Sequence, residues 1–119
     1  EEWEGNAPKG SLSLRGKLPK LNKNVNPVIG YVENTLDQFL ENYKPKINFV
    51  HLDMDIYEPT KKVLEYIKPR LVKGSIIAFD ELNDPDAPGE TLALMETIGL
   101  NNVELKKFPY ASRVSYFKL

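Results

Sequence analysis

The sequence contains no cysteine, only one histidine and no long run of hydrophobic residues. The missing cysteines exclude disulfide bonds and thiolate metal sites, and a chain without them is compatible with the cytoplasm, where we expect this protein. No stretch approaches the about 18 consecutive apolar residues of a membrane-spanning helix, and no signal peptide is visible, so no membrane association is expected. Acidic and basic residues nearly cancel, 17 against 16, which leaves no basic surface for nucleic acid.

The length of 119 residues allows one small domain. The hydrophobic and charged contents, 41% and 28%, are typical of a globular protein. Residues 1–24 hold three of the 7 glycines and two of the 9 prolines, and they show no sustained periodicity. We therefore expect residues 1–24 to form a loop that leads into an α/β domain over residues 25–119.

Strand and helix patterns alternate in this second part of the chain. Strands are predicted over 25–32, 47–52, 75–79, 103–108 and 114–117, and helices from Asn34 or Thr35 to Pro45, from Pro59 to Pro69, and from Glu90 to Ile98. The strand over 47–52 shows little alternation, which predicts burial on both faces. Gly74 is predicted to mark the turn into the strand over 75–79. The order β-α-β-α-β-α-β-β predicts parallel crossovers followed by an antiparallel hairpin.

Acidic residues follow two of the predicted strands. Asp53 and Asp55 come directly after one strand, and Asp80 with Glu81 comes after the next. Because the carboxyl ends of parallel strands build the ligand sites of open α/β sheets, we expect a common site around a cation or a polar substrate. Carboxylate ligands suit magnesium or calcium better than zinc. The alternative is that these acids cap helices or line a solvated cleft.

Three neighbours of these strand ends are further candidates, each with an alternative role. His51 lies two residues before Asp53 and so faces the same side of the strand; it is either a base or substrate contact, or a core histidine bonded to backbone. Asp55 is a general base or a partner of the first acid, unless it serves a turn or a helix cap. Tyr57 either packs over the site or covers the end of the sheet.

The residues around both acidic strand ends, and several upstream, also carry a family resemblance. They are His51–Thr60, Val63–Leu64, Pro69–Leu71, Lys73–Ser75 and Phe79–Glu81, with Glu1–Gly5, Pro8–Gly10, Gly16–Pro19 and Gly30–Leu36 before them. These stretches resemble the macrocin O-methyltransferase (TylF-like) group, which belongs to the class I S-adenosylmethionine-dependent methyltransferases.

The resemblance implies a fold, a cofactor and an acceptor. The fold would be a Rossmann-like sheet, mostly parallel, with an antiparallel hairpin at one edge. S-adenosylmethionine would be the cofactor, and Tyr57 and Trp3 would contact it. The alternative for Trp3 is that it belongs to a mobile terminus. Asp53, Asp80 and Glu81 fall where metal-dependent relatives hold a divalent cation, usually magnesium. The acceptor would be a small hydroxylated molecule such as a sugar, and a cation there could bind its hydroxyl and lower the hydroxyl's pKa.

One part of the family pattern is absent from the sequence. The family's first strand ends in a glycine-rich turn for the cofactor and its second strand ends in an acid, but no G-x-G-x-x-G occurs here. We therefore expect a C-terminal part of a methyltransferase that lacks the first two strands. The missing strands would lie between 25–32 and 47–53. We expect the exposed sheet edge to cause self-association, or 25–32 to pair directly with 47–53.

Two other functions remain open from the residues. A buried strand that ends in D-x-D is also the catalytic strand of haloacid-dehalogenase-like, magnesium-dependent phosphatases. Against this, Ile56 and Tyr57 follow Asp55 where that family has a small hydroxyl residue after one spacer, and no clear phosphate-binding lysine lies between the acidic motifs. The second alternative is a truncated methyltransferase-like domain that has no catalytic activity.

Overall fold

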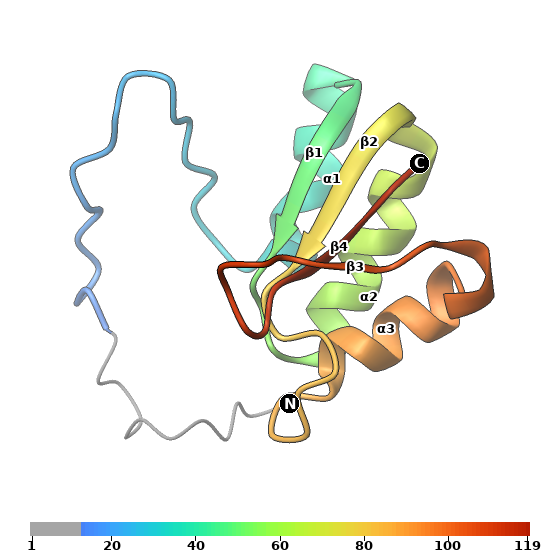
Figure 1. The fold of residues 1–119 in the computed structure, drawn as a ribbon. Coiled ribbons are helices and arrows are strands. Elements are labelled where there is room, and N and C mark those ends of the chain that lie inside the picture. The colour runs from blue at the N-terminus through green and yellow to red at the C-terminus, as the bar shows by residue number, and fades with distance from the viewer. Residues whose placement is uncertain (1–12) are drawn as a thin grey trace.

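The computed structural model describes residues 13–119, which form an α/β unit of three helices and a four-stranded mixed sheet (Figure 1). In chain order the elements are α1 (Val32–Tyr43), β1 (Ile47–Leu52), α2 (Tyr57–Ile67), a 3-10 turn (Lys68–Arg70), β2 (Leu71–Phe79), α3 (Gly89–Thr97), a second 3-10 turn (Leu100–Asn102), β3 (Lys106–Lys107) and β4 (Ser115–Lys118). None of the helices within the described residues is both long and apolar enough to cross a bilayer.

The strands lie in the order β1-β2-β4-β3. β1 pairs with β2 in parallel, and the crossover between them is α2, whereas β4 runs antiparallel to both of its neighbours. The predicted C-terminal hairpin is therefore confirmed, although β3 has only two residues and the predicted strand over 103–108 is too long. The sheet is mixed: β1, β2 and β3 run in one direction, with α2 and α3 between them along the chain, and β4 alone runs against them.

The hydrophobic core lies on one face of the sheet. Leu52, Ile77, Phe79 and Phe117 project from the strands onto α2 and α3, whose contributions include the fully buried Leu64 and Leu94. In the view of Figure 1, α1 and α2 lie behind the sheet. The amphipathic spacing of α2 contributes to this arrangement, because its apolar stripe of Val63, Leu64 and Ile67 is buried in the core.

The other face of the sheet is open among the described residues. Phe49 is 60% exposed, and the His51 side chain beside it on β1 is 44% exposed. The prediction that β1 is buried on both faces is therefore wrong. A parallel strand is buried on both faces only where helices cover both faces of the sheet. Here the described helices cover one face of the sheet.

Residues 13–31 form neither a helix nor a strand. The strand predicted over 25–32 is wrong, and so is its pairing with 47–53, because in the described part of the chain β1 has only β2 as a strand partner. Figure 1 shows this segment as a long loop that extends away from the sheet. Val25, Val28 and Ile29 are 46%, 51% and 71% exposed, so their β-forming side chains find no neighbouring strand. The domain boundary after residue 24 stays a prediction.

β2 is longer than predicted, because it begins at Leu71 rather than at Ser75. The turn predicted at Gly74 is wrong: this residue lies inside β2 with φ +92°, where the pairing with β1 shifts register. Glycine adopts this conformation without a steric penalty. The buried hydroxyl of Ser75 lies 2.7 Å from the carbonyl oxygen of Ile47 and links the two strands at the irregularity.

Gly89 allows α3 to approach the chain that follows β1. A Cβ atom built on this residue would lie 2.5 Å from backbone atoms of Asp55, Ile56 and Tyr57. Backbone cannot move as a flexible side chain can, so only glycine permits this contact. The start of α3 is thereby held against the turn that begins α2.

We expect Gly89→Ala to lower the free energy of unfolding by about 1–3 kcal/mol, because the added methyl group forces the helix away from the turn. Chemical denaturation followed by circular dichroism measures the change. Met95→Ala, on the half-exposed side of the same helix, is the matched control and should cost less. Equal stability of Gly89→Ala and the natural chain would contradict the close approach.

We also expect the chain to self-associate through the outer edge of β1, which carries no strand partner among residues 13–119. Exposed edges of this kind pair with other chains, and a charged residue on such a strand blocks the pairing. Phe49→Lys should weaken association at least about tenfold, measured by analytical ultracentrifugation over a range of concentrations. A monomer at all concentrations would count against this expectation.

Candidate functional site

The carboxyl ends of β1 and β2 lie side by side. Leu52 is paired with Phe79, and the backbone N–H of Asp80 donates a hydrogen bond of 3.0 Å to the carbonyl oxygen of Leu52. Asp53 and Asp80 each follow one member of this pair, so the structure places both at the same edge of the sheet. We call this the acidic edge.

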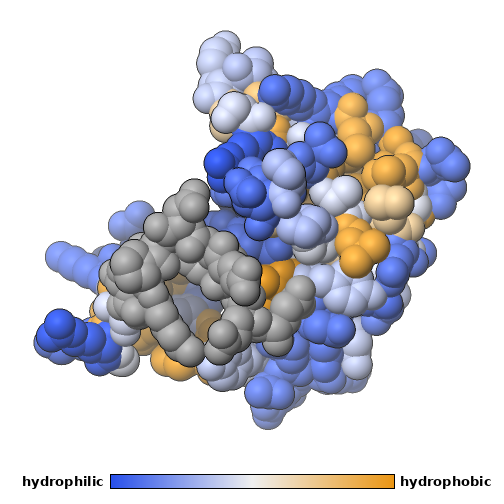
Figure 2. Space-filling view, turned by 90° about the horizontal axis from the view of Figure 1, so that it is seen from below, coloured by the Kyte–Doolittle hydropathy of each residue, from blue (hydrophilic) through white to orange (hydrophobic). Residues whose placement is uncertain are grey.

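Figure 2 shows the molecule from below Figure 1, which is the side toward which the arrowheads of β1 and β2 point. Hydrophilic residues dominate this surface, and hydrophobic residues gather at one side of it. Asp53 is exposed and Asp80 is partly exposed, so both carboxylates are accessible to a polar ligand.

Asp55 is at the centre of a tight turn between β1 and α2. The N–H of Ile56 donates to the carbonyl oxygen of Met54 at 2.6 Å, and Asp55 has φ +59°. An i to i+2 hydrogen bond with a positive φ at the middle residue is the rare, strained form of γ-turn. Strained backbone of this kind often occurs at ligand sites. The alternative role of Asp55, as a turn residue, accounts for the geometry equally well.

His51 lies next to Asp80, the residue that directly follows the neighbouring strand β2. Its Nε2 atom is 3.7 Å from Oδ1 of Asp80, and the two side chains are 44% and 37% exposed. The imidazole therefore projects from the open face and is not the buried, backbone-bonded histidine of the alternative interpretation. The structure thus brings His51 to the acidic edge beside Asp80.

Glu81 turns toward an arginine that the sequence interpretation did not connect with it. Arg113, in the loop between β3 and β4, donates from Nη1 to both Glu81 oxygens at 3.0 and 3.2 Å, and its Nε lies 3.2 Å from Oδ2 of Asp84. Burial raises the pKa of the Glu81 carboxyl, and the arginine opposes that shift. A hydrogen bond from the backbone N–H of Asp86 is the main cause that lowers the pKa of Asp84.

The three predicted metal ligands do not form a close cluster in this structure. Within residues 13–119, no group of three or more His, Cys, Asp or Glu side chains is gathered closely enough to hold a metal ion. The Glu81 carboxylate is directed at Arg113 instead. The assignment of Asp53, Asp80 and Glu81 as magnesium ligands stays a prediction.

The sequence interpretation missed Glu90, which lies in the first turn of α3 and is fully buried. Its Oε1 accepts the N–H of Met54 and its Oε2 accepts the N–H of Glu81, each at 3.2 Å. Burial raises the pKa of this carboxyl, although the backbone N–H donors oppose the shift. An acid at the start of a helix usually interacts with the helix dipole in solvent, so no sequence pattern indicates that Glu90 is buried.

Tyr57 joins two helices through its hydroxyl. The hydroxyl donates to Glu96 on α3 and accepts from Lys61 at 2.6 Å, and Lys61 also lies 2.8 Å from Glu96. The hydrogen bond with Glu96 is the main cause that raises the pKa of Tyr57. A cofactor contact of Tyr57 stays a prediction, and the other predicted contact, Trp3, lies outside the described residues.

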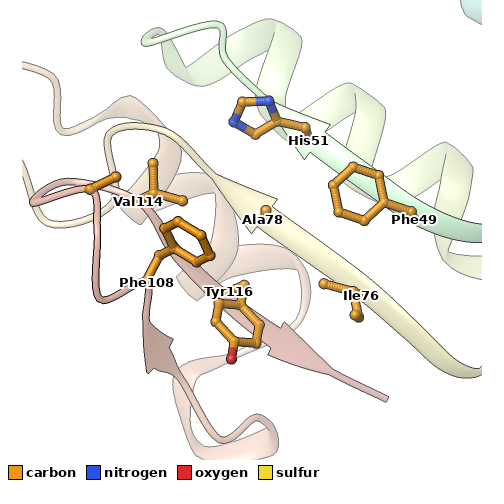
Figure 3. Close-up of a pocket in the computed structure, with 8 residues that line it drawn as sticks. Phe49, His51, Ile76, Ala78, Phe108, Val114 and Tyr116 are labelled. Carbon is orange, nitrogen blue, oxygen red and sulfur yellow. The ribbon is translucent and has the colours of Figure 1, made fainter.

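An apolar pocket of about 420 Å³ lies on the open face of the sheet next to His51 (Figure 3). Phe49 and His51 reach it from β1, and Phe108 and Tyr116 reach it from the C-terminal hairpin. Hydrophobic walls with a polar group at the rim are typical of small-molecule pockets. The pocket is therefore continuous with the acidic edge through His51.

Comparisons with known proteins agree with this architecture. Two solved structures of CalS11 match, one described as the apo structure of a TDP-rhamnose 3′-O-methyltransferase in calicheamicin biosynthesis and the other as the calicheamicin methyltransferase. Each is 43% identical to this chain, with a TM-score of 0.72 over 76% of it. The chain spans only 40% and 36% of the length of those two proteins. No curated protein sequence matches.

The described sheet and helices therefore correspond to part of a methyltransferase fold. A family model described as "Methyltransferase domain" matches residues 2–82, which include both strands of the acidic edge. On this match, the chain belongs to the methyltransferase domain family.

Proposed function

We propose that this chain is part of an S-adenosylmethionine-dependent O-methyltransferase of the macrocin O-methyltransferase (TylF-like) group. The acceptor would be a small hydroxylated molecule, and the activity printed for CalS11 makes a nucleotide-linked deoxysugar the first candidate. The proposal is supported by two observations in a methyltransferase domain: Asp53 and Asp80 follow the paired ends of β1 and β2, and His51 lies 3.7 Å from Asp80.

The residues of the acidic edge fit one side of a pocket for this cofactor. S-adenosylmethionine supplies, when bound, a methyl group on a positively charged sulfur. Carboxylates at strand ends favour such a cationic ligand. The described residues contain no glycine-rich turn, so their contribution would be the side formed by β1 and β2.

Methyl transfer to oxygen needs a group that takes the hydroxyl proton of the acceptor. We assign this role to the acidic edge, with Asp53, Asp55 and His51 as candidates. Asp80 beside Nε2 would hold the His51 ring in one orientation. The apolar pocket next to His51 would receive the less polar part of the acceptor and exclude water from it.

The first test is binding and transfer with the 119-residue chain. We expect micromolar binding of S-adenosylmethionine in calorimetric titration and transfer of labelled methyl groups to TDP-rhamnose. Asp53→Asn should weaken binding or turnover about tenfold or more, because it removes one charged partner. Glu65→Gln, an exposed carboxylate on α2, is the matched control and should change neither.

Other outcomes would decide between the remaining functions. No cofactor binding by the natural chain would favour the non-catalytic alternative for this chain alone. Rapid hydrolysis of a generic aryl phosphate, abolished by Asp53→Asn, would favour the phosphatase alternative, which the family match does not support.

A second test concerns magnesium. A cation bound by Asp53, Asp80 and Glu81 requires Glu81 to leave Arg113. We therefore expect Arg113→Gln to bind Mg²⁺ more tightly than the natural chain, by about tenfold, because the competing cation is removed. Isothermal titration with Mg²⁺ measures both affinities. Equal affinities would show that Glu81 is not a magnesium ligand.

A further inference from the structure

Glu90 is a charged group that the proposed reaction does not use. Among the described residues it is the one acidic or basic side chain that is fully buried. Removing a carboxylate from water is costly unless hydrogen bonds compensate for the lost hydration. The hydrogen bonds that Glu90 accepts from Met54 and Glu81 therefore indicate what the burial accomplishes.

Each Glu90 oxygen holds a different strand end. Oε1 accepts from the N–H of Met54, the residue directly after Asp53, and Oε2 accepts from the N–H of Glu81, the residue directly after Asp80. These two N–H groups lie just beyond the last paired residues of β1 and β2. One rigid carboxylate thus links the two segments that carry the acids of the acidic edge.

The position of α3 makes this link possible. Gly89 lets the start of the helix contact the backbone of the turn after β1, and Glu90 follows in the first helical turn. The partial positive charge at the helix N-terminus favours the ionised side chain there. Asp55, in the turn, acts on the Glu90 carboxyl in two ways: its backbone N–H lowers the pKa of Glu90, and the charge of its side chain raises it.

We propose that Glu90 is a positioning residue that fixes the spacing of Asp53 and Asp80 across the acidic edge. Its carboxylate bridges Met54 and Glu81 and so prevents the two strand ends from moving independently. This inference rests on the proposed function only in that Asp53 and Asp80 serve a common site.

The chemistry of the bridge requires two acceptor atoms. Glutamine has nearly the same shape but replaces one acceptor oxygen with an NH₂ group, which is a donor. In Glu90→Gln that group would face an N–H donor, so the side chain can hold Met54 or Glu81 but not both. Glu90→Asp keeps both acceptors on a side chain that is one methylene shorter.

The test is amide hydrogen exchange and NMR of the 119-residue chain. In the natural chain, we expect scalar coupling across the hydrogen bonds from the Met54 and Glu81 amides to the Glu90 carboxylate carbon. In Glu90→Gln, exchange of one of these two amides should accelerate about tenfold or more, while amides inside β2 change little. Absence of coupling at both amides in the natural chain would overturn the proposal, whether or not the variants fold.

Two controls separate positioning from general destabilisation. Leu94→Ala removes a fully buried side chain from the same helix and should accelerate exchange throughout β2. Glu65→Gln, on the surface of α2, should leave both amides unchanged. If Glu90→Gln accelerates exchange throughout the sheet, as Leu94→Ala does, the residue is merely structural and the proposal fails.

Titration with S-adenosylmethionine then distinguishes this inference from the proposed function. Weaker binding by Glu90→Gln, together with selective exchange at one amide, supports both. If the natural chain binds no cofactor but the NMR result holds, the proposed function fails and the bridge remains. If cofactor binds equally to both chains and both amides stay protected in Glu90→Gln, the positioning role is overturned.

Discussion

The parallel pairing of β1 with β2 is the interaction on which the rest of the structure depends. Their backbone hydrogen bonds align Leu52 with Phe79, so the chain leaves both strands at the same level. Everything at the acidic edge follows from this alignment, because Asp53 and Asp80 are the next residues along each strand. α2 makes the pairing possible, since parallel neighbours need a long crossover, and its apolar stripe buries one face of the strands.

The sequence predicted the elements whose signals are local. The bounds of β1 were predicted at Ile47 and Leu52, and all three helices were found within a few residues of their observed ends, because apolar periodicity and proline mark them. The prediction of a strand over 25–32 failed because a strand forms only when it pairs with another strand. No local sequence pattern encodes the presence of that partner. The prediction that both faces of β1 are buried failed because apolar side chains do not reveal which face of a sheet is covered by helices.

The same division applies to the site. Acids at two strand ends could be predicted to share an edge, because parallel topology places them there. The pairing of Glu81 with Arg113 joins residues 32 apart in the chain, and the bond from Met54 to Glu90 spans 36. Neither contact has a sequence signal, since each depends on how a loop or a helix returns to the strands. Of the two acids after β2, Asp80 thus faces the imidazole of His51, whereas Glu81 is neutralised by a guanidinium.

The open face of the sheet has a thermodynamic consequence. A protein that buries apolar surface on both sides of its strands exposes much of it on unfolding, and this sets a large heat-capacity change. Here Phe49 is already 60% in water in the folded state, and Phe108 is 43% exposed. The heat-capacity increment per residue should therefore lie below the usual about 12–15 cal/mol/K, and the stability curve should be correspondingly flat with temperature.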